Sequence, residues 1–255
     1  MNSLEVRSLS KRFGGVTAVD DLSFAVESGS IYSIIGPNGA GKTTVVNLLS
    51  GIYVPSAGTI TMIGEPASGR SPDALARLGL SRTFQNLQIC MNMDAISNVM
   101  IGGHIRLDSG FVSALLHLPH IRKRDAELRE EADALMGFVG LSQYRKAQAS
   151  QMPYGALKRL EIARALAAKP KILLLDEPAA GLNHVETEEI SSLIESIAAT
   201  GVTIVLVEHD MKLVMRVSTR ILVPDYGRKL AEGRPEEVRA DPQVVAAYLG
   251  AAAWA

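Results

Sequence analysis

Eight residues near the N-terminus have the types and the spacing needed to hold a phosphate group. The run is Gly36-Pro37-Asn38-Gly39-Ala40-Gly41-Lys42-Thr43, which fits the pattern G-x-x-x-x-G-K-[ST]. Its glycines let the backbone curl closely around an anion, where a Cβ atom would clash. The Lys42 ammonium can reach the outer phosphates of a nucleotide, and the Thr43 hydroxyl can bind Mg²⁺. The run therefore predicts a nucleoside triphosphate site.

The segments on both sides of this loop support that prediction. Ile31–Ile35 is a short apolar run typical of a buried strand, and Thr44–Ser50 has the character of a helix that ends at Gly51. A strand, a glycine-rich turn and a helix in this order direct backbone N–H groups and a helix N-terminus at one anion.

A second group of polar residues follows two aliphatic runs later in the chain. Asp176 and Glu177 come directly after the run 171–175, and His209 comes shortly after the run 202–207. In a phosphate-loop protein the first acid holds Mg²⁺, and the second can orient and deprotonate the attacking water. His209 can contact the γ-phosphate, and the amide of Gln85 can reach Mg²⁺ or the water. We therefore predict Glu177, His209 and Gln85 as catalytic residues and Thr43, Gln85 and Asp176 as metal ligands.

The overall composition limits the possible classes of protein. The chain has 255 residues, of which 47% are hydrophobic, so it can bury a large core. Its 26 basic and 27 acidic residues give a formal charge of −1, which argues against a nucleic-acid partner. A single cysteine, Cys90, cannot form a disulfide within the chain, which suits a reducing compartment. We expect Cys90 to serve in packing. No uncharged apolar run approaches the roughly 18 residues of a membrane-spanning helix, and residues 1–6 lack signal-peptide features. We expect a soluble chain that reaches a membrane only through partners.

The pattern of apolar residues predicts an α/β protein. Strands of an N-terminal antiparallel sheet are expected at 4–9, 22–26 and 60–63, whereas helical spacing replaces strand-like runs from about Pro72 to Ala168. In that block Leu128, Ala132, Leu135 and Val139 share one helix face, and Gly140 is expected to end the helix.

Parallel-sheet character returns after the helical block. Buried strands are expected at 171–176 and 202–207, joined by a crossover helix at 187–199 and followed by a strand at 221–223. We predict one domain over 1–255, with a helical subdomain inserted at about 86–168 and a helical tail at 235–250. The fold class is a phosphate-loop NTPase with a mixed or parallel core sheet and an N-terminal antiparallel β subdomain.

This combination resembles the ATP-binding cassette (ABC) ATPases over nearly the whole chain. That family carries a second nucleotide-contacting motif, usually Leu-Ser-Gly-Gly-Gln, and the matching segment here is Met152-Pro153-Tyr154-Gly155-Ala156. Pro153 replaces a serine that would contact the γ-phosphate, and Ala156 replaces a polar residue. Gly155 remains, so the resemblance implies a nucleotide half-site that is weakened but not abolished.

The resemblance also implies the cofactors ATP and Mg²⁺. Two subunits of this family pack head to tail and hold each ATP between the phosphate loop of one and the signature glycine of the other. Ala180-Gly181-Leu182-Asn183 matches the loop that crosses this interface, and Phe13 matches the aromatic residue that stacks on adenine. The ATP-binding residues implied are Phe13, Gly36, Pro37, Asn38, Gly39, Ala40, Gly41, Lys42, Thr43, Thr44, Tyr154 and Gly155.

Finer features look like the ATPase subunits of branched-chain (hydrophobic) amino acid importers. They are the segments 82–86, 178–183, 208–215 and 247–250, and the extra segment Leu107–Lys123 suits the longer of the two ATPases of such systems. The implied partners are a second ATPase, two membrane permease subunits and, indirectly, an external solute-binding protein. The implied location is the cytoplasmic face of a bacterial inner membrane.

Several alternatives stay open from the sequence alone. A signal-type GTPase or small-molecule kinase shares the phosphate loop, but the chain has no Asn-Lys-x-Asp guanine-reading motif. An ABC ATPase could instead serve urea or amide import or lipid export, although the segment Arg82–Asn86 argues against export. The altered signature also permits a weakly hydrolysing, regulatory half of an asymmetric heterodimer. The solute, the choice between homodimer and heterodimer, and the role of the residues after Gly250 are not fixed by the sequence.

Overall fold

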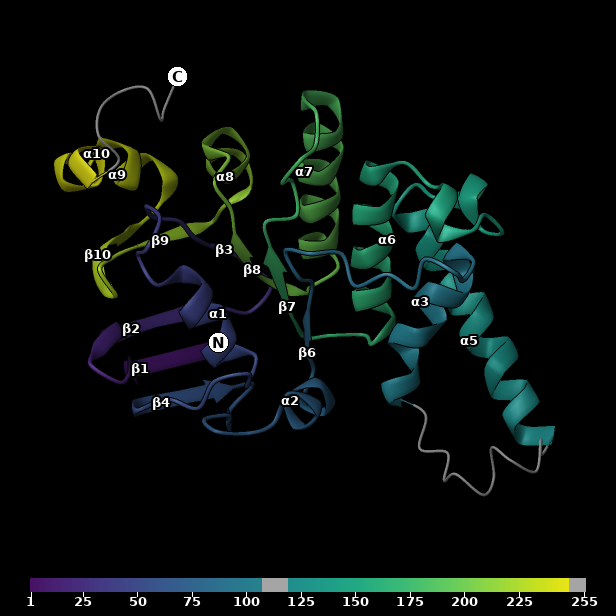
Figure 1. Ribbon diagram of the computed structural model, residues 1–255, viewed down its shortest axis with the longest axis horizontal. Coiled ribbons are helices and arrows are strands. Elements are labelled where there is room, and N and C mark those ends of the chain that lie inside the picture. The colour runs from purple at the N-terminus through teal and green to yellow at the C-terminus, as the bar shows by residue number, and fades with distance from the viewer. Residues whose placement is uncertain (107–118, 248–255) are drawn as a thin grey trace. The chain divides into compact units, whose positions relative to one another are not determined.

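The computed structural model describes residues 1–106 and 119–247. This part of the chain divides into two compact units, one formed by Met1–Arg82 with residues 171–247 and the other by Thr83–Pro170 (Figure 1). We call them the nucleotide unit and the helical unit and describe each by itself.

The nucleotide unit begins with an antiparallel sheet. Its strand order is β2-β1-β4-β5, formed by β1 (Asn2–Phe13), β2 (Val16–Glu27), β4 (Ala57–Met62) and β5 (Glu65–Pro66). In β1, Leu4, Val6 and Leu9 are buried on the face that packs into the core. The three strands predicted at 4–9, 22–26 and 60–63 are confirmed; the first two extend further at both ends, and the third begins earlier, at Ala57, and ends at Met62.

The second sheet is mixed and carries the phosphate loop. Its order is β10-β9-β3-β8-β7-β6, where β3 spans Ile31–Ile34, β6 Leu80–Arg82, β7 Ile172–Asp176, β8 Thr203–Val207, β9 Arg220–Asp225 and β10 Arg228–Gly233. Neighbouring strands from β9 to β6 are parallel, and β10 pairs antiparallel with β9. The predicted fold class is confirmed.

Two strands of this sheet correct the sequence prediction. Strand-like segments were expected to be absent between Pro72 and Ala168, yet β6 lies within that range and pairs with β7. Its three residues are too few for an alternating pattern to be recognised. The other strand, β10, is polar because it lies at the edge of the sheet, and it was not predicted either.

The helices of the nucleotide unit are α1 (Lys42–Leu49), α2 (Pro72–Leu78), α7 (His184–Ala199), α8 (Met211–Val217), α9 (Pro235–Ala240) and α10 (Pro242–Ala247). They include those predicted at 44–50 and 187–199, and a further helix, α8, that was not predicted. The segment predicted as one tail at 235–250 is broken at Asp241, which has ψ 117. Pro242 disfavours the helical conformation for the residue before it. Residues 248–250 lie outside the described part.

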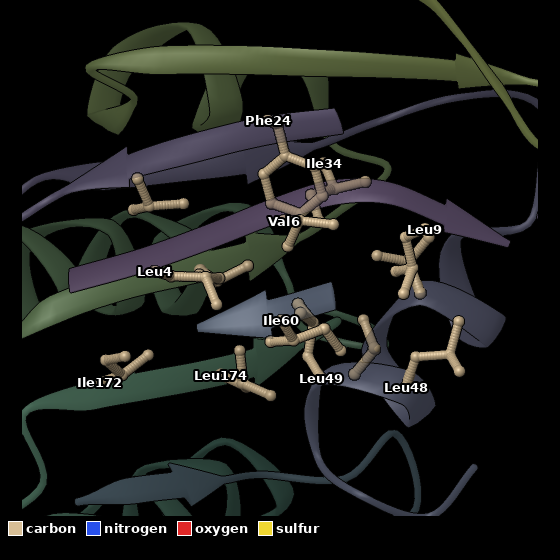
Figure 2. Packing of buried hydrophobic residues seen from close by; sticks show 14 of the residues in the cluster. Leu4, Val6, Leu9, Phe24, Ile34, Leu48, Leu49, Ile60, Ile172 and Leu174 are labelled. Atoms are coloured by element: carbon tan, nitrogen blue, oxygen red, sulfur yellow. The ribbon is translucent and has the colours of Figure 1, made fainter. Parts of the chain in front are cut away.

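The core of the nucleotide unit joins the two sheets through α1. Figure 2 shows Leu4 and Ile60 of the antiparallel sheet packed near Leu174 of the mixed sheet, with Leu49 of α1 among them. All four side chains are at most 2% exposed. Burying each aliphatic side chain contributes on the order of 1.5–3 kcal/mol, so this cluster fixes the helix that follows the phosphate loop.

The helical unit contains α3 (Ala95–Gly103), α5 (Pro119–Phe138), α6 (Tyr154–Ala167) and three short 3₁₀ turns at His104–Arg106, Ser142–Tyr144 and Ala149–Gln151. In α5, Leu128 and Ala132 are buried as predicted, but Met136 takes the buried position expected of Leu135, and Val139 is buried in the turn just after the helix. Gly140, at φ 71, follows the end of the helix as predicted. Of the segment 107–123, residues 107–118 lie outside the described part. Within residues 1–106 and 119–247, no helix is long and apolar enough to cross a membrane.

Candidate functional site

The phosphate loop connects β3 to α1 in a conformation that requires its glycines. Gly39 and Gly41 have φ 83 and 95, in the left-handed region that side chains disfavour. A Cβ on Gly36 would lie 2.6 Å from Pro224 O, and one on Gly41 would lie 2.5 Å from Ala18 O. The glycines thus allow close backbone packing around the start of α1, whose N-terminal N–H groups can hold an anion.

Lys42 is bound within its own loop. Its Nζ donates to Gly36 O at 2.5 Å and to Pro37 O at 2.9 Å, and the residue is 7% exposed. Burial lowers the pKa of Lys42 below its ordinary value, and the negative charge of Glu177 opposes this effect. Ile34, just before the phosphate loop, and Asp176, just before Glu177, are both level with Val207 of β8, so Glu177 lies at the same edge of the sheet as the phosphate loop.

Asp176 ends β7 beside the helix of the phosphate loop. Its Oδ2 accepts a hydrogen bond from Arg82 Nη2 at 2.8 Å, and the two side chains are only 9% and 8% exposed. Arg82 Nη1 also donates to Asn47 Oδ1 on α1 at 2.7 Å and to Ser50 Oγ, at the C-cap of α1, at 2.8 Å. No role was predicted for Arg82 itself, because its contact with Asp176, 94 residues away, leaves no local signal in the sequence.

Glu177 and His209 lie side by side at the carboxyl ends of two neighbouring parallel strands. Asp176 of β7 is in register with Val207 of β8, and Glu177 N donates to Val207 O at 2.8 Å. His209 Nε2 lies 2.8 Å from Glu177 Oε1. Glu177 has φ 50, a conformation that is uncommon for residues other than glycine, asparagine and aspartate. A carboxylate paired with an imidazole in this way can accept and pass on a proton.

Glu208 is a third carboxylate at this edge and was not predicted as a site residue. It is 3% exposed, and its oxygens accept from Ala179 N at 2.7 Å and from His209 N at 2.9 Å. Burial raises the pKa of Glu208 and the charge of Glu177 adds to this, whereas the backbone donors oppose it. The available signal was a charged residue placed directly after the aliphatic run of β8.

Phe13 lies at the end of β1 with one face partly covered. Its ring makes an edge contact with Tyr53 at a centroid distance of 5.1 Å, and Lys11 Nζ lies 5.0 Å from its centroid. Phe13 is nonetheless 42% exposed. An exposed aromatic ring held in place by neighbours suits stacking on a flat base.

Gln85 belongs to the helical unit, where its segment is bound to α6. Lys158 Nζ donates to Gln85 O at 3.4 Å, and Glu161 Oε1 accepts from Phe84 N at 3.4 Å and from Gln88 N at 3.3 Å. Arg164 donates to Gln88 O. These α6 side chains recur every three residues and so face the same side of the helix.

The altered signature lies at the start of the same helix. Tyr154 is the first residue of α6 and is 45% exposed, whereas Gly155 is buried. Pro153 occupies the N-cap position and makes no side-chain hydrogen bond to the helix. Tyr154 and Gly155 thus sit where a helix N-terminus can face an anion, as predicted from the sequence.

The loop predicted to cross a subunit interface leads into α7. Asn183 caps this helix, because its Oδ1 accepts from Glu186 N at 3.1 Å and its own N donates to Glu186 Oε2 at 3.0 Å. Asparagine and aspartate are about equally good at this position. Either residue could therefore cap α7 at position 183.

The predicted metal ligands are oxygen donors, which suit Mg²⁺. Thr43 and Asp176 both belong to the nucleotide unit, and Gln85 belongs to the helical unit. In residues 1–106 and 119–247 there is no group of three or more histidine, cysteine, aspartate or glutamate side chains that could hold a metal by itself. A single carboxylate with a hydroxyl fits Mg²⁺ bound chiefly through phosphate oxygens and water.

The fold and the site define a phosphate-loop nucleotide-binding domain with an acidic pair and a histidine at the sheet edge. Residues 19–180 match the family described as "ABC transporter", and residues 228–253 match "Branched-chain amino acid ATP-binding cassette transporter". The chain belongs to the ATP-binding subunits of ABC transporters, which are ATPases. This membership confirms the resemblance and excludes the GTPase and kinase alternatives.

Relatives and solved structures agree with this membership. The chain is 44% identical to the high-affinity branched-chain amino acid transport ATP-binding protein BraF of Pseudomonas aeruginosa and 45% identical to LivG of Salmonella typhimurium, over 98% of each chain. It resembles a crystal structure of a nucleotide-free ATP-binding cassette from an ABC transporter, with 30% identity and a TM-score of 0.85. The match covers 98% of this chain and 100% of that structure's chain. The chain also resembles the ADP conformation of the cassette MJ1267 at 30% identity (TM-score 0.86, same coverage).

Proposed function

We propose that this chain hydrolyses ATP as one half of a head-to-tail ATPase dimer and thereby powers the import of branched-chain amino acids through membrane partners. The observation that carries the hydrolytic part is the 2.8 Å contact between Glu177 and His209 next to the phosphate loop. The solute class is supported by the names of the full-length relatives, and the matched segment 228–253 agrees with it.

ATP binding is assigned to the two units in different ways. In the nucleotide unit, the phosphate loop, Lys42 and Thr44 bind the triphosphate, and Phe13 stacks on adenine. In the helical unit, Tyr154 and Gly155 are assigned to the ATP of the partner subunit. Lys42 must exchange its two loop carbonyls for phosphate oxygens, so its present contacts keep the ammonium paired before ATP arrives.

Hydrolysis is assigned to residues around the γ-phosphate. Thr43, Asp176 and Gln85 would hold Mg²⁺, which when bound neutralises charge on the β- and γ-phosphates. Glu177 orients the attacking water and accepts its proton. His209 donates to the γ-phosphate and, through its contact with Glu177, keeps that carboxylate directed at the water.

Membership of the ABC transporter family supports the proposed partners. A second ATPase subunit completes each ATP site, two membrane permease subunits form the pathway, and an external solute-binding protein delivers the solute. The chain is then peripheral at the cytoplasmic face of a bacterial inner membrane.

Replacement of the proposed base tests the hydrolytic assignment. Glu177→Gln keeps the size of the side chain but removes its ability to take a proton, so turnover should fall by about 10²-fold or more while ATP still binds. The variant should also accumulate as an ATP-bound dimer, measured by light scattering together with its cognate ATPase. Glu195→Gln, on the outer face of α7, is the control and should keep normal turnover. Normal turnover in Glu177→Gln would remove Glu177 from the role of base.

Uptake in cells tests the solute class. A strain that carries Glu177→Gln in place of the normal chain should lose uptake of radiolabelled leucine at low external concentration and keep uptake of labelled urea. Loss of urea uptake with unchanged leucine uptake would contradict the branched-chain assignment. Such a result would favour the urea or amide alternative.

A further inference from the structure

Glu208 is a buried carboxylate that the roles assigned above leave unused. It follows β8 just as Glu177 follows β7, and these strands are parallel neighbours with Asp176 level with Val207. Glu208 therefore lies beside the turn that begins at Glu177. Only 3% of Glu208 is exposed, which is rare for a glutamate unless its oxygens have partners.

The partners of Glu208 come from both loops of the site. Oε1 accepts from Ala179 N at 2.7 Å, two residues beyond Glu177. Oε2 accepts from His209 N at 2.9 Å and, more weakly, from Asp210 N at 3.5 Å. The Glu208 carboxylate thus joins the turn after Glu177 to the backbone of His209, whose side chain contacts Glu177.

The turn that Glu208 holds has an unfavourable backbone conformation. Glu177 has φ 50, and such a conformation persists in a residue other than glycine only where surrounding contacts fix it. The contacts that fix the turn include Glu177 N to Val207 O at 2.8 Å, Ala180 N to Glu177 O at 3.2 Å, and Ala179 N to Glu208 Oε1 at 2.7 Å. Releasing the contact with Glu208 would allow the turn to relax and the Glu177 carboxylate to move away from His209.

We infer that Glu208 is a positioning residue for ATP hydrolysis, which holds Glu177 and His209 in one arrangement by binding the backbone of both loops. The inference rests on the roles proposed for Glu177 and His209. A carboxylate suits this task better than an amide, because every contact described for it is with an N–H donor. Glutamine would present its own N–H₂ group to one of those donors.

The test compares variants of the full-length chain. Glu208→Gln and Glu208→Ala should lower kcat by about 10- to 100-fold, because small displacements of a catalytic group have effects of this size, and should leave KM for ATP unchanged. Glu232→Gln is the matched control. Glu232, on β10, is also largely buried, with 14% of its side chain exposed. Its Oε1 accepts a hydrogen bond from Tyr32 Oη of β3 at 2.9 Å. It should keep normal kcat when each variant is assayed well below its melting temperature.

Three results would overturn the inference. They are normal kcat in Glu208→Gln, an equal loss in Glu208→Gln and Glu232→Gln, or a rise in KM that accounts for the whole loss. Should Glu208→Ala fail to fold, Glu208→Asp gives the same test, because it keeps the charge but is too short to reach both loops. Its kcat should also fall at unchanged KM, and normal kcat would contradict the inference.

A double variant separates positioning from the proposed role of Glu177. Groups that act as a unit show non-additive losses, so adding Glu208→Gln to Glu177→Gln should reduce the residual turnover much less than it reduces normal turnover. An equal fold-loss in both backgrounds would contradict the inference. Normal turnover in Glu177→Gln alone would reject Glu177 as the proposed base. Slow turnover in Glu177→Gln together with normal turnover in Glu208→Gln would reject only the inference about Glu208.

Discussion

At the scale of single residues, Arg82 and Asp176 are two charged side chains that the fold buries together as an ion pair. Arg82 contacts Asp176, Asn47 and Ser50, so it links the strand β7 to the helix of the phosphate loop. Both members of the pair are more than 90% buried, and a buried charge that loses its partner is costly.

This pair gives a prediction about stability. Arg82→Met preserves most of the side-chain volume but leaves Asp176 buried without its cation, so the free energy of unfolding should fall by about 3–5 kcal/mol. Arg7→Met is the control, because Arg7 is 77% exposed and its pair with Glu5 should contribute at most about 1 kcal/mol. Urea denaturation measures both. Equal losses in the two variants would contradict the structural role given to Arg82.

Residue types predicted the phosphate loop well because its motif is continuous in the sequence. Gly39, Gly41 and Lys42 lie within four residues, and the structure shows the positive φ angles that glycine allows at Gly39 and Gly41. The contacts of Arg82 and Glu208 could not be predicted in the same way. Asp176 reaches Arg82 through the pairing of β7 with β6, and Ala179 reaches Glu208 through the pairing of β7 with β8, so these contacts join segments far apart in the sequence.

At the scale of elements, the packing of α3 on α6 depends on one glycine. A Cβ on Gly102 would lie 1.8 Å from Arg164 O, a backbone atom that no rotamer change can move. The two helices therefore approach closely at this point. Because α6 also binds the backbone of Gln85 and Gln88, this approach supports the segment predicted to contact the γ-phosphate.

Gly102→Ala should force α3 and α6 apart. Overpacking of this kind costs typically about 1–3 kcal/mol, and hydrogen exchange in peptides covering 83–106 and 154–167 should become faster. Gly137→Ala in α5 is the matched control. Its Cβ would lie an ordinary 3.7 Å from Ser142 Oγ, and alanine should stabilise the helix by about 0.5–1 kcal/mol. Unchanged exchange in Gly102→Ala would contradict the close packing.

Long elements were predictable, and short ones were not. The helix predicted at 187–199 is observed as His184–Ala199, and the strand predicted at 202–207 is observed as Thr203–Val207. Strand β6 has only three residues, and β10 lies at a sheet edge where polar side chains are tolerated. Apolar periodicity detects neither case, because it needs several turns or a buried face.

At the scale of the whole molecule, the predicted site residues divide between the two units. Phe13, the phosphate loop, Asp176, Glu177 and His209 belong to the nucleotide unit, whereas Gln85, Tyr154 and Gly155 belong to the helical unit. Family membership could be predicted from motif order along the chain. The way in which subunits assemble could not be predicted from this sequence, because the residues that complete each ATP site are expected from another subunit.

The altered signature predicts unequal ATP sites in a heterodimer. Pro153 offers no hydroxyl for the partner's γ-phosphate, and losing a hydrogen bond to a charged group costs about 1.5–3 kcal/mol. The site that contains the partner's phosphate loop should therefore hydrolyse ATP more slowly than the site that contains Lys42. Single-turnover assays, with the base replaced in each subunit in turn, measure the two rates. Equal rates would contradict this prediction.

The left-handed backbone at Glu177 has a consequence for the history of such a sequence. Glycine or asparagine would occupy that conformation with less strain, so selection for heat resistance alone would favour replacing the acid there. Its retention in a living lineage would require continuous selection for turnover. In a laboratory population that no longer needs import, we expect Glu177 to be replaced early. The protein that carries the replacement should be more stable to heat.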